Sequence, residues 1–138
     1  MANTIPGTRR REAGPRRLLL LLLLVLMAAG CGGDLAVAPP VDLDRGRAVL
    51  RDALDAWKGG QPYDALAGGT PPIRVADEDW LAGLRLTSYR IDPKDQLVGA
   101  MLRCPVSLSL KDKAGKTVKK RACYNVTTSP APAVIRQD

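Results

Sequence analysis

The sequence predicts an α+β domain in which one N-terminal helix packs on an antiparallel sheet of about four strands. Residues 43–58 place apolar side chains at helical spacing, and residues 98–110 alternate apolar and polar side chains with the period of a strand. A short glycine-containing turn follows the alternating segment and predicts a hairpin. The chain of 138 residues has the length of one small domain.

The predicted helix at residues 43–58 begins and ends with recognisable signals. Asp42 or Asp44 can accept hydrogen bonds from its first amides, and Lys58 precedes two glycines that end it. Gly46 weakens the first turn. The face that we expect to pack on the sheet combines large and small apolar residues, namely Leu43, Val49, Leu50, Ala53, Leu54, Ala56 and Trp57.

Strand-forming segments follow the helix and are separated by turn-forming residues. The apolar residues of the second strand shift from even to odd numbers near Ser88, which predicts a β-bulge. Pro105 lacks an amide hydrogen, so it must lie at an edge, in a bulge or at an unpaired position. The expected strands cover residues 73–75, 84–91, 98–110, 117–126 and 133–136.

The turn at residues 112–116 predicts the register of the central hairpin. Asp112 faces Lys116 across a three-residue loop in which Gly115 takes the left-handed conformation. Apolar residues then face one another along the ladder except where Leu108 faces Lys120, and this agreement between turn and pattern supports the register. The predicted pairs are Leu110–Val118, Leu108–Lys120, Val106–Ala122, Cys104–Tyr124 and Leu102–Val126.

The N-terminal residues 1–30 are typical of a signal peptide. Five Arg and one Glu give residues 1–17 a net charge of +4, and ten apolar residues follow at 18–27. As a helix this apolar segment spans about 15 Å, half of a hydrocarbon core of about 30 Å. The segment therefore predicts export rather than a membrane-spanning helix.

The residues Ala28-Ala29-Gly30-Cys31 resemble the lipobox of bacterial lipoproteins. The resemblance implies that Cys31 carries diacylglycerol with acyl chains such as palmitate, and that residues 1–30 are removed. Two or three acyl chains anchor a protein almost permanently. Gly32, where an Asp would imply inner-membrane retention, favours the outer membrane. An ordinary secretory cleavage and an uncleaved anchor are the alternatives.

The mature chain then divides into two parts. Residues 31–42, the lipidated Cys and a stretch rich in Gly, Ala and Pro, are expected to form a flexible tether with a mean reach of about 18 Å. Residues 43–138 form the single α+β domain. The domain would therefore lie close to the membrane that holds the anchor.

The two cysteines of the domain, Cys104 and Cys123, form the candidate disulfide. Export to an oxidising compartment favours a bond. The predicted register opposes it, because Cys104 faces Tyr124 and the neighbouring Cys123 points to the other face of the sheet. A bulge at Pro105 could realign the two thiols; without it, the register predicts that they stay free.

Basic residues gather near the tip of the predicted hairpin. With Asp112 they give a local net charge of +5. They are either a contact for anionic headgroups or an acidic envelope polymer, or a solvated surface that discourages aggregation, which is the commoner role of such runs. No aromatic residues lie among these charges, so nucleic acid is not expected. The residues are Lys111, Lys113, Lys116, Lys119, Lys120 and Arg121.

Catalytic and metal-binding patterns are weak in this sequence. The chain contains no His, which excludes Ser–His and Cys–His nucleophile pairs and His-containing zinc sites. Asp77, Glu78 and Asp79 lack the spacing of a calcium loop, so we expect them to begin a helix or turn. The sequence predicts no cofactor and no metal. We expect Trp57 and Trp80 to pack in the core or between helix and sheet. The tyrosines that could offer hydroxyls to a cavity are Tyr63, Tyr89 and Tyr124.

Residues 54–136 resemble a family of small lipoproteins of planctomycete bacteria that has no established activity. The helix and meander are also similar to the cystatin-like and minimal nuclear-transport-factor-2-like architectures, which host both enzymes and binding modules. The residues that carry the family resemblance are Ala56-Trp57-Lys58-Gly59, Thr70-Pro71-Pro72-Ile73, Asp79-Trp80, Leu86-Thr87-Ser88-Tyr89, Cys104-Pro105-Val106, Gly115-Lys116 and the segment 124–130.

These features favour an exported, lipid-anchored protein facing the periplasm or cell surface, whose domain is a non-catalytic binding or interaction module. Its expected partners are the membrane and an envelope protein or anionic surface. One alternative is a small enzyme or ligand carrier with a cavity between helix and sheet. Another is an accessory subunit that docks through the basic hairpin or an open sheet edge.

Overall fold

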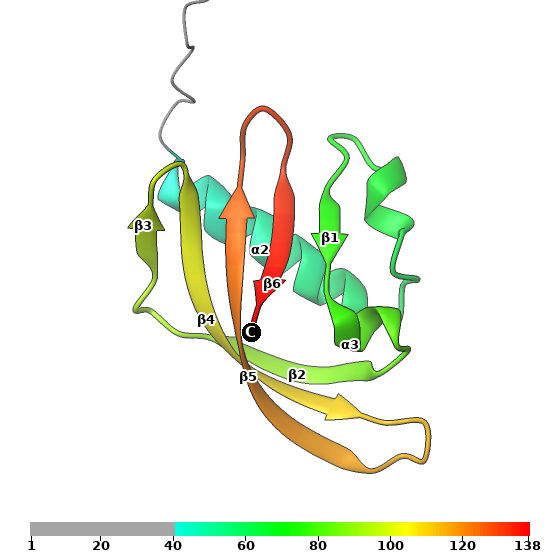
Figure 1. The fold of residues 1–138 in the computed structure, drawn as a ribbon. Helices are drawn as coiled ribbons and strands as arrows, with labels where there is room; N and C mark the ends of the chain where they lie inside the picture. The colour runs from blue at the N-terminus through cyan, green and yellow to red at the C-terminus, as the bar shows by residue number, and fades with distance from the viewer. Residues whose placement is uncertain (1–40) are drawn as a thin grey trace, which may run out of the picture. The chain divides into compact units, whose positions relative to one another are not determined.

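In the computed structural model, which describes residues 41–138, one long helix packs on a curled six-stranded sheet (Figure 1). The predicted fold class is thereby confirmed. The signal peptide, Cys31 and nearly all of the predicted tether lie outside the described residues. The elements are α2 (Leu43–Lys58), η1 (Ala65–Gly68), β1 (Arg74–Ala76), α3 (Glu78–Leu81), β2 (Arg85–Ile91), β3 (Gln96–Val98), β4 (Met101–Lys111), β5 (Thr117–Thr127) and β6 (Ala133–Gln137).

The sheet has the order β1-β6-β5-β4-β2, and β3 pairs with β4 beyond the end of β2. Only β1 and β6 run parallel. The predicted number of about four strands was too small, partly because the segment 98–110, expected as one strand, is divided between β3 and β4. Gly99, with a φ of 60°, and Ala100 turn the chain between β3 and β4. No helix among the described residues is long and apolar enough to cross a membrane.

The central hairpin has the predicted register, with each predicted pair found between β4 and β5. Gly115 takes the left-handed conformation with a φ of 81°. The Asp112 carboxylate accepts hydrogen bonds from the amides of Ala114 and Lys116 at 2.9 and 2.8 Å and closes the loop. The side chain of the turn's first residue thus stabilises the conformation that sets the register.

The predicted irregularities on the other side of β4 are also present. The register of β2 against β4 shifts between Leu86 and Ser88, where a bulge was expected. Pro105 accepts a hydrogen bond from the amide of Asp92 at 2.8 Å. The backbone N and O of one residue point to the same side of an antiparallel ladder, so the Pro105 nitrogen also faces Asp92, the residue after β2. The missing amide hydrogen of Pro105 therefore costs no hydrogen bond between β4 and β5.

Helix α2 begins at Asp42, whose carboxylate accepts hydrogen bonds from the amides of Asp44 and Arg45. Its predicted apolar face is buried except for Leu43, which is 38% exposed and for which the prediction was wrong. Val41, just before the helix, is buried there instead. Gly46 permits α2 to lie close to both β4 and Val41, since a Cβ on it would lie 2.9 Å from Leu102 Cδ2 and 3.3 Å from Val41 Cγ1.

The two tryptophans Trp57 and Trp80 are buried in the core, as predicted. The rings of Trp57 and Trp80 stack with centroids 5.4 Å apart, and Tyr63 meets Trp80 edge-on. Their indole N–H groups donate to the carbonyls of Leu84 and Gln61 at 2.8 and 3.1 Å. These contacts fasten the segment between α2 and β2 to the end of the helix.

Candidate functional site

A polar cluster is buried where α3 meets β5 and β6. Asp77 caps α3, and one carboxylate oxygen accepts the amides of Asp79 and Trp80 at 2.9 and 3.0 Å. Its other oxygen accepts the Tyr124 hydroxyl at 2.5 Å. The expectation that residues 77–79 begin a helix is confirmed. The described residues contain no group of three or more His, Cys, Asp or Glu side chains that could hold a metal ion.

Asp79 connects α3 to both strands. Its carboxylate accepts hydrogen bonds from Lys120 Nζ at 2.7 and 3.0 Å and from the Arg136 guanidinium. Arg136 also approaches Asp77 at 3.6 Å and pairs with Asp138 at 2.9 Å, and its side chain is only 7% exposed. We name Asp77, Asp79, Lys120, Tyr124 and Arg136 the polar cluster.

Within the polar cluster the pKa of Asp79 lies below its usual value and the pKa of Tyr124 lies above it. Burial by itself raises the pKa of Asp79, but the hydrogen bonds from Lys120 and Arg136 outweigh it and hold that pKa below its usual value. Burial and the Asp77 carboxylate raise the pKa of Tyr124 far above its usual value. Every buried side-chain N or O atom in residues 41–138 has a partner. Such a satisfied network can hold α3 in place against β5 and β6.

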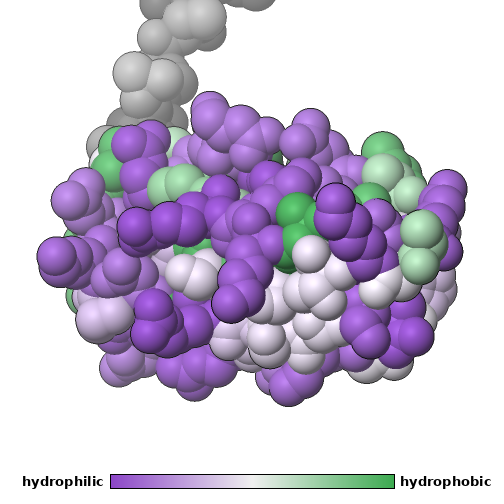
Figure 2. Space-filling model, turned by 90° about the horizontal axis from the view of Figure 1, so that it is seen from below, coloured by the Kyte–Doolittle hydropathy of each residue, from purple (hydrophilic) through white to green (hydrophobic). Residues whose placement is uncertain are grey.

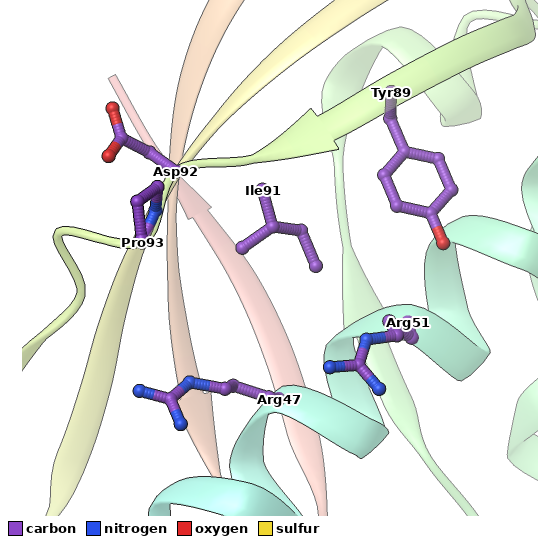
Figure 3. A pocket seen from close by; sticks show the side chains of 6 residues that line it. All are labelled: Arg47, Arg51, Tyr89, Ile91, Asp92 and Pro93. Atoms are coloured by element: carbon purple, nitrogen blue, oxygen red, sulfur yellow. The ribbon is translucent and has the colours of Figure 1, made fainter.

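A second arrangement of polar groups lies at the surface between α2 and β2. Arg47 and Arg51 of α2, Tyr89 and Ile91 of β2, and the following Asp92 and Pro93 line a groove of about 400 Å³. Figure 3 shows Tyr89 and Ile91 pointing from β2 toward the helix. We call this hollow the α2–β2 groove.

Most polar groups of the α2–β2 groove are held in place by neighbours. The Arg47 guanidinium forms two hydrogen bonds with Asp95, at 2.6 and 3.0 Å, and ties the β2–β3 loop to the helix. The Tyr89 hydroxyl donates to Asp55 at 2.7 Å; burial, and then this carboxylate, raise the pKa of Tyr89 to about 12. Arg51 is exposed and forms no ion pair within residues 41–138.

The six basic residues of the hairpin do not behave alike. Lys120 turns to Asp79 in the polar cluster, and Arg121 lies 3.4 Å from Asp92 while 75% exposed. Lys111, Lys113, Lys116 and Lys119 are exposed and have no ion pair among the described residues. Figure 2 shows that the side of the molecule seen from below is largely hydrophilic.

The candidate disulfide is not formed. Cys104 and Cys123 are both free. Cys104 faces Tyr124 across the ladder, and Cys123 faces Pro105. Since these two pairs are adjacent in the register, the two cysteine side chains point to opposite faces of the sheet. Cys104 is fully buried, and burial raises its pKa to about 11, whereas Cys123 is half-buried. The free thiols agree with the register on which the sequence argument against a bond rested.

We expect iodoacetamide at pH 8 to alkylate Cys123 in the native protein and to leave Cys104 unmodified. The thiolate is the reactive form, and Cys104 is both protonated at this pH and inaccessible. Peptide mapping by mass spectrometry measures the modification at each position, and both react after denaturation in urea. Recovery of a Cys104–Cys123 disulfide from the unreduced native chain would contradict this register.

The structure is that of a small α+β domain in which β2, at the end of the strand order, lies beside the partly cationic α2–β2 groove. No family model, curated protein or solved structure matches this chain. The polar cluster and the α2–β2 groove each bring together residues that lie far apart in the sequence.

Proposed function

We propose that the chain is an exported envelope lipoprotein, anchored through Cys31, whose domain binds a partner without catalysing a reaction. One observation carries the proposal: a basic segment, ten apolar residues and Ala28-Ala29-Gly30-Cys31 follow one another in the order of a lipoprotein signal. The resemblance of residues 54–136 to small planctomycete lipoproteins supports it. Gly32 favours the outer membrane as the place of the anchor.

The chemistry of the domain supports binding rather than catalysis. The sequence has no His, and the polar cluster has its protons and charges committed to internal partners. The unpaired cations lie at the surface, where Arg51 borders the α2–β2 groove. These are features that can recognise an anionic group but supply no general base near neutral pH.

No specific observation favours the alternative of an enzyme or carrier with a cavity between helix and sheet. Leu50 of α2 and Leu102 and Leu110 of β4 are all 0% exposed at this interface. Their side chains occupy the space that a ligand between the two layers would need. The α2–β2 groove lies instead at the edge of the sheet that β2 forms.

Lipidation is tested by producing the full chain in a Gram-negative bacterium fed an alkyne analogue of palmitate. We expect the wild-type chain to carry the label and to partition into detergent, because two or three acyl chains outweigh the solubility of a small domain. Cys31→Ser removes the acceptor thiol and abolishes both. Mass spectrometry of the labelled chain is expected to show Cys31 at its N-terminus.

The matched control is Cys123→Ser, which removes another thiol and keeps label and partitioning unchanged. Label that persists in Cys31→Ser, or a wild-type chain recovered unlabelled with residues 1–30 attached, would overturn the anchor.

A further inference from the structure

We propose that the free edge of β2 and the α2–β2 groove bind an extended acidic segment of a partner protein, which adds as a strand to the sheet. This inference rests on the proposed function, since it names the partner class of the binding module. We call Arg51, Arg85, Tyr89, Arg90 and Ile91 the β2 edge site.

The backbone of β2 is available for pairing. Strand β2 ends the order of the sheet and, within residues 41–138, pairs with β4 alone. The amide of Asp92 donates to Pro105 across this ladder. In antiparallel pairing, alternate residues direct their N–H and C=O groups to the same neighbour, so Arg90 faces β4 as well. The backbone N–H and C=O groups of Tyr89 and Ile91 consequently point to the free edge. There a peptide strand can accept hydrogen bonds from these N–H groups and donate to these C=O groups.

The opposite end of the sheet offers no comparable edge. Strand β1 has three residues, and the carbonyl of Val75 within it already accepts the Tyr63 hydroxyl at 2.7 Å. Strand β2 has seven residues. The longer edge is also the one beside a groove, so an added strand would find backbone partners and space for its side chains on the same side of the molecule.

Charge favours an acidic occupant of the β2 edge site. Arg51 on the groove side and Arg85 and Arg90 on β2 are exposed, and none forms an ion pair within residues 41–138. The nearby carboxylates of Asp92 and Asp95 already pair with arginines. The Asp55 carboxylate accepts the Tyr89 hydroxyl, and it and Asp52 of α2 are the remaining negative charges that face Tyr89. Acidic side chains of an added strand can therefore neutralise these arginines on both of its faces.

The same charges disfavour a second copy of this chain at the edge. Antiparallel pairing of β2 with its own copy would bring Arg85 and Arg90 of the two strands beside one another. Like charges on neighbouring strands are destabilising. Basic residues at an exposed edge are a common device against such self-pairing.

The test uses the full chain in a non-ionic detergent and a fluorescein-labelled eight-residue peptide that alternates Glu and Thr. We expect fluorescence anisotropy to report binding, and hydrogen exchange to slow at the amides of Tyr89 and Ile91. Replacing each Glu of the peptide by Lys, or methylating every second peptide amide, weakens binding about tenfold or more, since either change removes one half of the interaction.

The protein variants separate the edge from general charge attraction. The double variant Arg51→Glu, Arg90→Glu is expected to weaken binding about tenfold, while Arg74→Glu, the same change on the exposed surface of β1, leaves it within about twofold. Ile91→Pro removes one outward amide without removing a bond to β4 and weakens binding as well.

Three results would overturn strand addition: no binding at millimolar peptide, equal binding of the methylated peptide, or a dimer of the chain that Ile91→Pro dissociates. If the peptide binds but Cys31 is not lipidated, strand addition stands and the anchor fails. If Cys31 is lipidated but the peptide does not bind, the anchor stands and strand addition is overturned.

Discussion

Arg136→Met is expected to lower the free energy of unfolding by about 3–5 kcal/mol at pH 7, because removing one partner of a buried ion pair leaves the other charge unpaired. Arg136 is 7% exposed and contacts both Asp77 and Asp79. Domains of this size are stable by about 5–15 kcal/mol in total. Urea unfolding followed by circular dichroism measures the loss, which is a large fraction of the whole.

The loss should shrink as the pH falls. In the native protein the pKa of Asp79 is held below its usual value. Its stabilising contribution is therefore complete above the pKa of the unfolded chain and declines as the pH falls through the lower, native pKa. Without Arg136 the effect of burial weighs more and the pKa of Asp79 rises. Lowering the pH therefore relieves the variant more than the wild type.

The control for Arg136→Met is Arg74→Met, which removes an exposed arginine that forms no ion pair among the described residues. It should change stability by no more than about 0.5 kcal/mol. An Arg136→Met variant that matches this control at pH 7, or that loses as much stability at pH 4 as at pH 7, would show that the polar cluster does not hold the two acids as described.

The parts of the fold that local chemistry determines could be predicted from the sequence. The hairpin register follows from Asp112, Gly115 and the alternation on both sides of them, all within one short stretch of chain. The bulge after Leu86 follows from a shift in the same kind of pattern. When the turn residues and the alternation of apolar and polar residues predict the same register, few other registers would bury the apolar side chains.

The parts that depend on distant contacts could not be predicted. Asp79 meets Lys120 and Arg136 across 41 and 57 residues, and no periodicity joins these positions. One signal was present: Lys120 is the residue that breaks the apolar ladder opposite Leu108, and a charge at a half-buried position requires a partner. Whether β2 lies at an edge likewise depends on the order of the strands, which the alternation within β2 does not contain.

Leu50→Ala is expected to cost about 2–5 kcal/mol of unfolding free energy, since Leu50 is 0% exposed and its removal leaves a cavity between α2 and the sheet. Leu43→Ala, the same change two turns earlier, should cost about 1 kcal/mol or less, because Leu43 is already 38% exposed.

Helix propensity cancels between these two variants, so urea unfolding compares burial alone. The sequence pattern places both leucines on one face, but Gly46 lies close to both Leu102 and the buried Val41, and Leu43 stays outside the core. Equal losses for the two variants would mean that the first turn of α2 packs on the sheet after all. A large difference would locate the start of the helix–sheet interface at Gly46 rather than at the first leucine of the pattern.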